Sequence, residues 1–599
     1  MPLDDSSADV RARPASTGDA TRPGPDPAAV PSPLSAGPIQ AGPVQAGTVP
    51  ASTVPASTGP AGTAAAPAGA RHPASHRATA TRTGAGGQDA AGQDAVGPDR
   101  PARLWDPATC LIATGVAAVY TVISVFRYLR RDPTSWDLGI FTEYVKQYAN
   151  LKAPIVNIKA GGFDLLGDHF HPIVALIAPF FRLFPTSVTL LVAQALLAGL
   201  SVLPISQLGR ELLGSAAGRS IAAAYGLSWG LQQMANYDFH EIAFAVPLLA
   251  FSLSALVRGR TRVAVAWALP LVFVKEDQGF TVLAIGLIMA FVYRRSAAGL
   301  LLQCWGMLWS LLAILVIIPH FNPQHTYQYW SEAGAFNPVG GHVSVSALWS
   351  TLSDGASTKL PTLAMILLPT AFIALRSPVI LAALPSLALR AIDTNPAYWG
   401  TAWHYNATVM PIVFIAAIDA IARIRARRHA LASRPGSGEP APAGRAETGP
   451  PRSRLLEGLG TAAERYGAAA MVAICAALAF QFPLSSLWTP ATYTLGPHVT
   501  AENRAMALVP DGASVSTDLD LLAPLAARTN TYWLGNASTN PATQYVVFDS
   551  QSTDCTAWPA VCLSAQPRTV LHEVESLTHG ARYRQIYESN GIFVFRLTS

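Results

Sequence analysis

Charged residues are scarce in this chain. Of its 599 residues, 13% are Asp, Glu, Lys or Arg, whereas 50% are hydrophobic, and the mean hydropathy is +0.30. A soluble domain typically carries about 25% charged residues, so this composition excludes an ordinary soluble protein. The net charge is only +5, and the arginines lie in short runs beside apolar segments. Such runs mark membrane orientation, whereas nucleic-acid binding requires many phosphate contacts; nucleic acid is therefore excluded as a partner.

Cysteine is also rare, with five residues in the whole chain. Cys110, Cys304 and Cys475 fall inside apolar segments, where a cysteine is usually a small buried hydrophobic side chain. Cys555 and Cys562 lie in polar sequence near the C-terminus. They are either a local disulfide on an oxidising side of the membrane or two unpaired thiols in a loop.

No apolar core followed by a cleavage site lies near Met1, so the sequence does not predict a secretory signal peptide, and the first membrane segment is expected to be an uncleaved anchor. Residues 1–102 consist mainly of Ala, Pro, Gly, Ser and Thr, with near-repeats such as AGPIQAGPVQAG. This composition cannot bury enough apolar surface to offset the entropy of the chain. It predicts a disordered cytoplasmic tail.

Apolar runs follow one another from Pro107 onward and predict a polytopic α-helical membrane protein. Each spanning helix needs about 20 residues, or fewer where neighbours shelter its ends. About eleven are expected, at residues 108–127, 186–208, 219–235, 242–257, 263–274, 278–293, 298–318, 361–375, 377–391, 406–422 and 467–487. The run 172–184 is too short to cross a bilayer, and we expect it to lie along the outer surface.

The arginine runs predict the orientation. Three loops share one side of the membrane when the helices alternate, and they carry Arg258, Arg260 and Arg262, then Arg294 and Arg295, then Arg423, Arg425, Arg427 and Arg428. That side is therefore expected to be cytoplasmic, although Arg127, Arg130 and Arg131 oppose the assignment. The predicted units are a transmembrane core at 103–429 with a large first outer loop at 128–185, a cytoplasmic linker at 430–465, a last helix at 466–489 and an extracytoplasmic α/β domain at 490–599.

Polar residues that interrupt the apolar pattern gather on the predicted outer face. They are Asp137, Asp168, His169 and His171 in the first outer loop, Asp238, His240 and Glu241 in the next, Lys275, Glu276 and Asp277 in the third, and Arg390, Asp393, His404 and Tyr405 in a later one. Ionisable residues beside a bilayer are costly and usually have a function. The pattern predicts one shared site built from these loops.

The carboxylates and imidazoles allow several roles. Asp137 is either a general base for an acceptor hydroxyl or the cap of an interfacial helix. Asp168, His169 and His171 are either metal ligands or hydrogen-bonding groups of a loop. Asp238 and Glu241, with Asp137, offer oxygen ligands to Mg²⁺ or Mn²⁺, and an ion-pair network without metal is the alternative.

The cations and aromatic residues suggest a substrate with a phosphate. Lys275 either meets a lipid-borne phosphate or belongs to a salt bridge within its own triplet. Arg390 is placed for a phosphate, or it reaches the interface from its helix end. The aromatic loop HTYQYW, residues 325–330, either stacks on a sugar ring or belongs to an interfacial aromatic belt.

Five motifs carry a family resemblance: WDLGIF, GDHFHP, YDFHE, KED and ENRAMALVPDGASVSTD. Together they resemble an uncharacterised family of predicted bacterial and archaeal membrane proteins that is grouped with the GT-C glycosyltransferases, over about residues 105–599. The resemblance implies a GT-C-like fold and an inverting transfer of a sugar from a polyprenyl-phosphate-type lipid donor to an acceptor on the outer side.

In GT-C enzymes an essential carboxylate lies early in the first outer loop, before an interfacial helix. Asp137 occupies this place, and 172–184 resembles the helix. Several GT-C enzymes carry two adjacent acidic residues at this point, whereas Leu138 follows Asp137, so Asp168 or Glu241 would have to supply a second carboxylate.

The sequence thus predicts a lipid-linked sugar transferase of the cell envelope that contacts membrane lipids, a lipid-linked donor and an envelope acceptor. The predicted substrate-binding residues are His169, His171, His240, Lys275, Arg390, His404 and Tyr405. One alternative is a transporter or flippase of lipid-linked intermediates with its charges along the pathway, but these charges gather on one face and no internal repeat is visible. The other is a non-catalytic envelope scaffold whose C-terminal domain is the active part.

Overall fold

The computed structural model describes residues 103–132, 136–332, 345–433, 451–536, 539–552, 567–578 and 580–598. The predicted disordered tail, residues 434–450 of the predicted linker, and Cys555 and Cys562 lie outside these residues. Cys110, Cys304 and Cys475 are free thiols, and Cys475 is buried.

Within the described residues, five helices are long and apolar enough to cross a membrane: Pro107–Leu129, Val188–Leu213, Ser296–Phe321, His404–Ala430 and Gly458–Ala479. Five shorter apolar helices are Pro172–Leu183, Glu241–Val257, Thr261–Phe273, Gln278–Phe291 and Pro378–Ile392. The chain is thus a helical membrane protein, and most of these helices stand where the hydropathy pattern predicts them.

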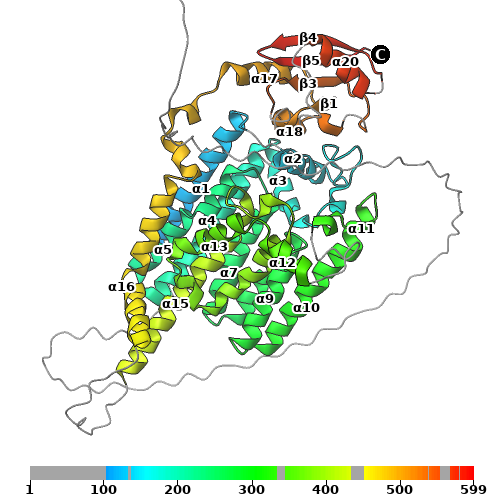
Figure 1. The fold of residues 1–599 in the computed structure, drawn as a ribbon. Coiled ribbons are helices and arrows are strands. Elements are labelled where there is room, and N and C mark those ends of the chain that lie inside the picture. The colour runs from blue at the N-terminus through cyan, green and yellow to red at the C-terminus, as the bar shows by residue number, and fades with distance from the viewer. Residues whose placement is uncertain are drawn as a thin grey trace, which may run out of the picture.

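The helices of the membrane part form one bundle (Figure 1). In chain order they are α1 (Pro107–Leu129), α4 (Val188–Leu213), α5 (Ser215–Gly226), α6 (Trp229–Asn236), α7 (Ala245–Val257), α8 (Thr261–Ala268), α9 (Gln278–Phe291), α10 (Ser296–Leu312), α11 (Ile318–Phe321), α12 (Val345–Ser353), α13 (Ala356–Leu367), α14 (Leu384–Ile392), α15 (Val409–Ala432) and α16 (Pro451–Ala479). A π-helical turn, Ala313–Ile317, joins α10 to α11.

Three predicted elements differ from the observed ones. The segment 219–235 is broken at Leu227 into α5 and α6. The segment 361–375 unwinds after α13 where Ala371 and Phe372 adopt left-handed backbone angles. Helix α16 begins at Pro451, within the predicted linker, because RSRLLEGLGTAAERYGAAA is rich in good helix formers.

Small residues let neighbouring helices approach closely. A Cβ atom added at Gly279 of α9 would lie 2.3 Å from the carbonyl oxygen of Gly306 in α10. Backbones packed this tightly are typical of membrane helix pairs. The contact fixes the start of α9, directly after the Lys275–Asp277 triplet.

The first outer loop is folded against one end of the bundle. It contains α2 (Trp136–Ala149), the 3-10 helix Pro172–Ile177 and α3 (Ala178–Leu183). Tyr144 and Val145 of α2 are fully buried, whereas Phe180 and Leu183 of α3 are more than 60% exposed. Exposed apolar side chains on a short helix suit the predicted position along a membrane surface.

The C-terminal part is an α/β domain whose described strands form one five-stranded sheet, in the order β2-β1-β3-β5-β4. The strands are β1 (Ser514–Thr517), β2 (Asn530–Trp533), β3 (Tyr545–Asp549), β4 (Tyr583–Ser589) and β5 (Ile592–Leu597), with helices α17 (Pro497–Ala507), α18 (Leu519–Ala526) and α20 (Pro567–Leu577). Strand β1 pairs in parallel with β2 and β3, and β5 pairs antiparallel with β3 and β4.

This domain lies on the first outer loop, above α2 and α3 in Figure 1. Lys146 Nζ of α2 donates to the carbonyl oxygens of Ala526 and Thr529 at 2.7 and 2.6 Å. Ser187 Oγ donates to Ala523 O at 2.7 Å. Leu522 and Ala523 of α18 belong to the same hydrophobic core as the bundle, so the two parts are joined by apolar packing as well as by hydrogen bonds.

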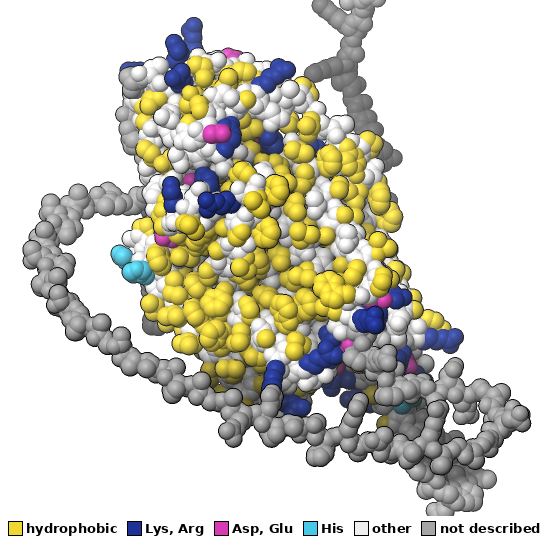
Figure 2. Space-filling view, turned by 180° about the vertical axis from the view of Figure 1, so that it is seen from behind, with side chains coloured by type: hydrophobic (Ala, Val, Ile, Leu, Met, Phe, Trp, Pro, Cys, Tyr) yellow, Lys and Arg dark blue, Asp and Glu magenta, His cyan; other side chains and the backbone are white. Residues whose placement is uncertain are grey.

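The predicted cytoplasmic loops meet at the opposite end. Arg258 lies 3.6 Å from Glu211 at the end of α4, Arg425 donates to Leu212 O at 3.2 Å, and the Arg423 guanidinium stacks near Tyr293. Figure 2 shows hydrophobic side chains covering the bundle between two ends at which Lys and Arg gather. The three arginine loops therefore share one end, as the predicted orientation requires.

Candidate functional site

A cavity of about 240 Å³ opens among the polar loops at the end of the bundle that faces the C-terminal domain. Its polar and aromatic wall consists of His169, His240, Lys275, Glu276, Asp277, Gln278, Tyr327, Tyr329, Trp330, Ser386, Arg390, Asp393, Tyr398, Tyr405 and Thr408, and its apolar wall of Ile242, Phe280, Ile314, Leu389 and Ile392. Of the predicted site residues, His169, His240, Lys275, Arg390 and Tyr405 line it directly. Segments more than 200 positions apart in the sequence thus share one cavity.

Lys275 and Glu276 precede α9 and pair with different loops. Lys275 Nζ lies 3.4 Å from Glu241 Oε1. Burial alone would lower the pKa of Lys275, but the carboxylates of Glu241, Glu276 and Asp277 raise it above its ordinary value. Lys275 therefore keeps its positive charge in the cavity wall.

Glu276 is the most heavily bonded group of the site. Its Oε1 lies 2.7 Å from His169 Nδ1 and accepts from the Tyr327 hydroxyl at 3.0 Å, and its Oε2 accepts from Phe170 N at 3.1 Å. Burial would raise the pKa of Glu276, but His169 and Lys275 hold it at about 2. These three contacts occupy both oxygens of the Glu276 carboxylate. Two of them hold His169 and Phe170 of the GDHFHP segment in place.

Burial and Lys275 lower the pKa of His169, but the carboxylates of Glu276 and Asp168 outweigh them and the net shift is upward. The protonated form of His169 is therefore favoured by its pairing with Glu276 in the cavity wall. Its ring also stacks on Tyr329, with the ring centroids 4.3 Å apart.

Asp168 does not line the cavity. Its Oδ2 lies 3.0 Å from Lys159 Nζ, and its Oδ1 accepts from the Tyr329 hydroxyl at 3.1 Å. Burial would raise the pKa of Asp168, but Lys159 and His169 lower it below its ordinary value. These contacts indicate a structural role for Asp168, which holds Tyr329 in the cavity wall. The predicted catalytic role of Asp168 stays a prediction.

The imidazoles of His171, His240 and His404 pack among aromatic rings, and of these three His240 lines the cavity. His240 and His404 stack with centroids 3.8 Å apart, and His171 packs edge-on against Phe141 at 5.3 Å. His171 and His404 are 1% exposed, and their ring nitrogens have no hydrogen-bond partner within the part of the chain that the structure describes. Burial lowers the pKa of His171 to about 4, so its ring is neutral.

Gln194 of α4 fixes the YDFHE segment. Its side-chain amide donates to Met234 O and Asp238 O at 3.0 and 2.7 Å and accepts from His240 N at 3.1 Å. These bonds satisfy backbone groups where the helical pattern is interrupted. They place His240 on the cavity and Glu241 beside Lys275.

Arg390 reaches the cavity from α14. Its Nε donates to Tyr398 O at 2.8 Å and its Nη1 to Asn406 Oδ1 at 2.9 Å. Asn406 in turn donates to Gly400 O at 3.1 Å. No carboxylate forms an ion pair with Arg390 among the described residues, so its charge is available to an anion.

Asp137, the predicted base, lies in the first turn of α2 and outside the cavity wall. Its Oδ2 accepts from the Tyr237 hydroxyl at 2.6 Å. The Tyr237 ring packs at 4.7 Å from His404 and at 5.1 Å from Trp403. Burial and Asp137 raise the pKa of Tyr237, so this hydroxyl keeps its proton, and neither Asp137 nor Tyr237 is among the residues that line the cavity.

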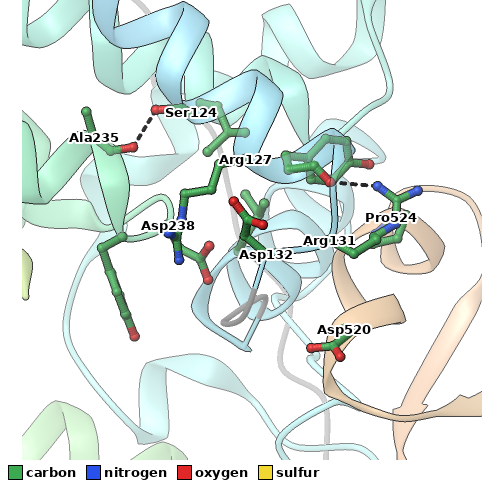
Figure 3. Close-up of a pocket in the computed structure, with 12 residues that line it drawn as sticks. Ser124, Arg127, Arg131, Asp132, Ala235, Asp238, Asp520 and Pro524 are labelled. Carbon is green, nitrogen blue, oxygen red and sulfur yellow. Dashed lines mark hydrogen bonds between the residues drawn. The ribbon is translucent and has the colours of Figure 1, made fainter. Parts of the chain in front are cut away.

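Asp238 lines a different, much smaller pocket of about 20 Å³, shown in Figure 3 with Arg127, Asp132 and Asp520. Asp238 and Arg127 point toward one another there (Figure 3). Burial and Asp137 raise the pKa of Asp238 well above its ordinary value, and Arg127 opposes the shift.

The predicted metal site is therefore not formed as expected. Among the described residues, the single His, Cys, Asp and Glu group with ligand-like spacing is His498, Glu502 and Asp549 in the C-terminal domain. Asp238 turns toward Arg127, and Glu241 is neutralised by Lys275 and contacts His240 at 2.8 Å. Ion pairing, the alternative to metal binding, is observed for Glu241.

The sequence pattern missed several cavity residues. Asp277 lines the cavity beside Lys275. Within the triplet KED, a binding role was predicted for Lys275 and none for Asp277. Tyr398 and Ser386 lie in segments without a distinctive motif. HTYQYW was noted for its rings, and Tyr327, Tyr329 and Trp330 indeed line the cavity.

Comparisons with known proteins give one family and several distant structures. A family model described as "Predicted membrane protein (DUF2079)" matches residues 132–437, more than half of the chain. The crystal structure of ArnT from Cupriavidus metallidurans bound to undecaprenyl phosphate matches with a TM-score of 0.45 and 14% identity, over 81% of this chain and 97% of that chain.

A crystal structure of an oligosaccharyltransferase from Archaeoglobus fulgidus, in complex with zinc and sulfate, matches with a TM-score of 0.34 and 14% identity, over 80% of this chain and 73% of that chain. A search of curated proteins gave no match.

Proposed function

This chain belongs to the DUF2079 family of predicted membrane proteins, and we propose that it is an integral membrane glycosyltransferase. In this proposal it transfers a sugar from a polyprenyl-phosphate-type donor to a cell-envelope acceptor. The observation that carries the proposal is the composition of the cavity, where Lys275 and Arg390 meet a carboxylate, several aromatic rings and an apolar wall.

The two cations suit a phosphate. Lys275 offers a point charge, and the planar Arg390 guanidinium suits phosphate oxygens. A departing lipid phosphate gains negative charge as its bond to the sugar breaks, and preorganised cations stabilise this charge. Glu241 already pairs with Lys275, and the proposed step relies on the two cations.

The apolar wall suits the lipid part of the donor. It is formed by side chains of α9, α14 and the π-helical turn Ala313–Ile317, which contributes Ile314. Such turns are rare and are frequent at functional sites. Tyr327, Trp330 and Tyr398 offer ring faces on which a sugar can pack.

In the proposed reaction an acceptor hydroxyl oxygen forms a bond to the anomeric carbon while the bond from that carbon to the phosphate oxygen breaks. Attack from the face opposite the phosphate inverts the anomeric centre. The hydroxyl proton passes to a carboxylate, and the lipid phosphate leaves with the bonding electrons. Lys275 and Arg390 hold the leaving phosphate.

Two carboxylates compete for the role of base. Asp277 lines the cavity; burial raises its pKa and Glu276 adds to the shift, whereas Lys275 opposes it. A carboxylate with a raised pKa at a cavity suits a general base. Asp137 is the base that the family resemblance implies, but it accepts from the Tyr237 hydroxyl and does not line the cavity. We propose Asp277 as the base and Asp137 as the group that holds Tyr237.

A transfer assay tests this proposal. Membranes that contain the wild-type chain are incubated with radiolabelled polyprenyl-phosphate sugars, alongside D277N, D137N and the control D511N, an exposed residue of the C-terminal domain. We expect loss of transfer in D277N and a partial loss in D137N. Loss in D137N with full activity in D277N would return the role of base to Asp137. Absence of transfer by the wild type with every polyprenyl-phosphate sugar would overturn the proposed function.

A further inference from the structure

The C-terminal domain holds a second cluster of chemically active side chains, remote from the cavity. His498 and Glu502 lie four positions apart on α17, so they share one face of the helix. Asp549 is the last residue of β3. One ligand atom from each of the three lies within 4.8 Å of the other two. The cluster sits at the carboxyl ends of parallel strands, where side chains of several strands converge.

The hydrogen bonds of His498 define its tautomer. Nδ1 lies 3.0 Å from the carbonyl oxygen of Asn590, which can only accept, so Nδ1 carries a proton. Nε2 lies 2.8 Å from Asp549 Oδ2, which as a carboxylate oxygen also accepts. A lone pair on Nε2 would repel this oxygen, so a proton or a metal ion must lie between them. Metal-bound histidines usually donate their other nitrogen to a carbonyl in this way.

Glu502 provides an independent indication. Its side chain is 1% exposed, and its Oε2 accepts no hydrogen bond from any residue that the structure describes. The nearest cation is the Arg131 guanidinium of the core, whose Nε lies 3.8 Å from Oε2. A buried carboxylate oxygen without a hydrogen bond is costly, and a cation beside His498 and Asp549 would remove this cost.

We propose that His498, Glu502 and Asp549 form a binding site for a divalent transition-metal ion of the zinc class. One imidazole and two carboxylates are ligands that Zn²⁺ accepts at about 2.0–2.2 Å. Three protein ligands leave a fourth position for water, and the His498 side chain, which is 30% exposed, gives the solvent access to it.

The site would connect two parts of the molecule. Arg131, at the end of α1, donates from Nη2 to Asn503 Oδ1 of α17 at 2.8 Å and also faces Glu502. The metal would fix α17 to the end of the sheet directly beside this contact. Loss of metal should therefore loosen α17 more than any helix of the bundle.

Zinc binding to the purified, untagged full-length chain tests the proposal. The protein is stripped with a chelator, loaded with Zn²⁺, washed and measured by elemental mass spectrometry. The variants are E502Q and H498A, with H572A as the control, because His572 is an exposed histidine of α20 outside the cluster. Each measurement is repeated with Cys555→Ser and Cys562→Ser, so that thiols cannot supply the ligands.

We expect one Zn²⁺ per chain in the wild type and in H572A, and an affinity at least about 100-fold lower in both cluster variants. Co²⁺ in place of Zn²⁺ should give a visible absorption band that E502Q lacks. E502Q keeps the shape of the side chain, and circular dichroism verifies its fold. Equal zinc in the wild type and E502Q, or no zinc in either, would overturn the proposal and leave a His498–Asp549 ion pair.

Discussion

The charged side chains at the two ends of the helical bundle differ in how deeply they are buried. At the arginine end, Arg428 is 51% exposed, and its partner Glu464 is 20% exposed. At the cavity end, Glu241 and Glu276 are 1% exposed and depend on Lys275 and His169. Exposed pairs contribute about 0–1 kcal/mol, whereas buried charges cost several kcal/mol each unless well paired. The comparison shows that the cavity end keeps buried charges whose burial costs free energy and which a reaction can use, whereas the other end keeps more exposed charges.

The largest difference between the ends should appear when a carboxylate is removed. Glu276→Ala leaves His169, Phe170 N and the Tyr327 hydroxyl without their acceptor, and we expect a loss of about 3–5 kcal/mol of stability. Glu464→Ala at the arginine end, which removes the partner of the half-exposed Arg428, should cost about 0–1 kcal/mol. Denaturant unfolding in detergent measures both, and equal losses would contradict the contrast.

Removal of a cavity cation should affect transfer more than stability. We expect Lys275→Ala to lower the transfer rate by about 10²–10³-fold, the usual effect of removing one group that stabilises developing charge. The matched control is Arg258→Ala at the other end, which should keep the wild-type rate. Similar rates in the two variants would show that Lys275 does not contact the leaving group.

Glu143, a buried residue of α2, should make the free energy of unfolding depend on pH. Burial raises the pKa of Glu143 from 4.5 to about 7, although Lys146 opposes the shift. Because the folded pKa is raised, the contribution of this group to stability is present below pH 4.5 and is lost as the pH rises through about 7. Glu143→Gln should therefore gain up to about 3 kcal/mol relative to the wild type between these values. Unfolding of both proteins from pH 4.5 to 8 measures the difference, and parallel curves would refute the assignment.

The smallest expected effect concerns the contact between the cavity end and the C-terminal domain. Ser187→Ala removes the hydrogen bond to Ala523 O, and we expect a local loss of about 0.5–1.5 kcal/mol. Faster hydrogen exchange should be confined to α18. Ser201→Ala, which removes buried bonds inside the bundle, serves as the control and should leave exchange in α18 unchanged.

Much of the architecture follows from the sequence, because hydropathy reports directly on burial in lipid. The membrane helices, the surface position of 172–184 and the gathering of polar loops all rest on this signal. The loop that carries Lys275 was expected at the cavity end for the same reason, and the structure places it there. The breaks at Leu227 and Ala371 could not be predicted, since they depend on packing between helices instead of local composition.

The details of the site were less predictable. Asp137 and Asp238 were interpreted by residue type, but Tyr237 and Arg127 decide where their oxygens point. Asp168 was predicted to be a catalytic carboxylate from its motif, and in the structure its two oxygens contact Lys159 and Tyr329. Both Lys159 and Arg127 are ordinary residues in the sequence. Partners that come from distant loops carry no local pattern, so the role of a carboxylate cannot be inferred from its own motif.

Binding of a lipid-borne phosphate tests the central claim most directly. Purified wild-type protein, the double variant Lys275→Ala/Arg390→Ala and the control Arg258→Ala are each titrated with undecaprenyl phosphate and with undecaprenol, and bound lipid is measured by native mass spectrometry. We predict that the wild type and the control prefer the phosphate by at least about tenfold, and that the double variant binds both lipids equally. The same preference for the phosphate in all three proteins would contradict the account.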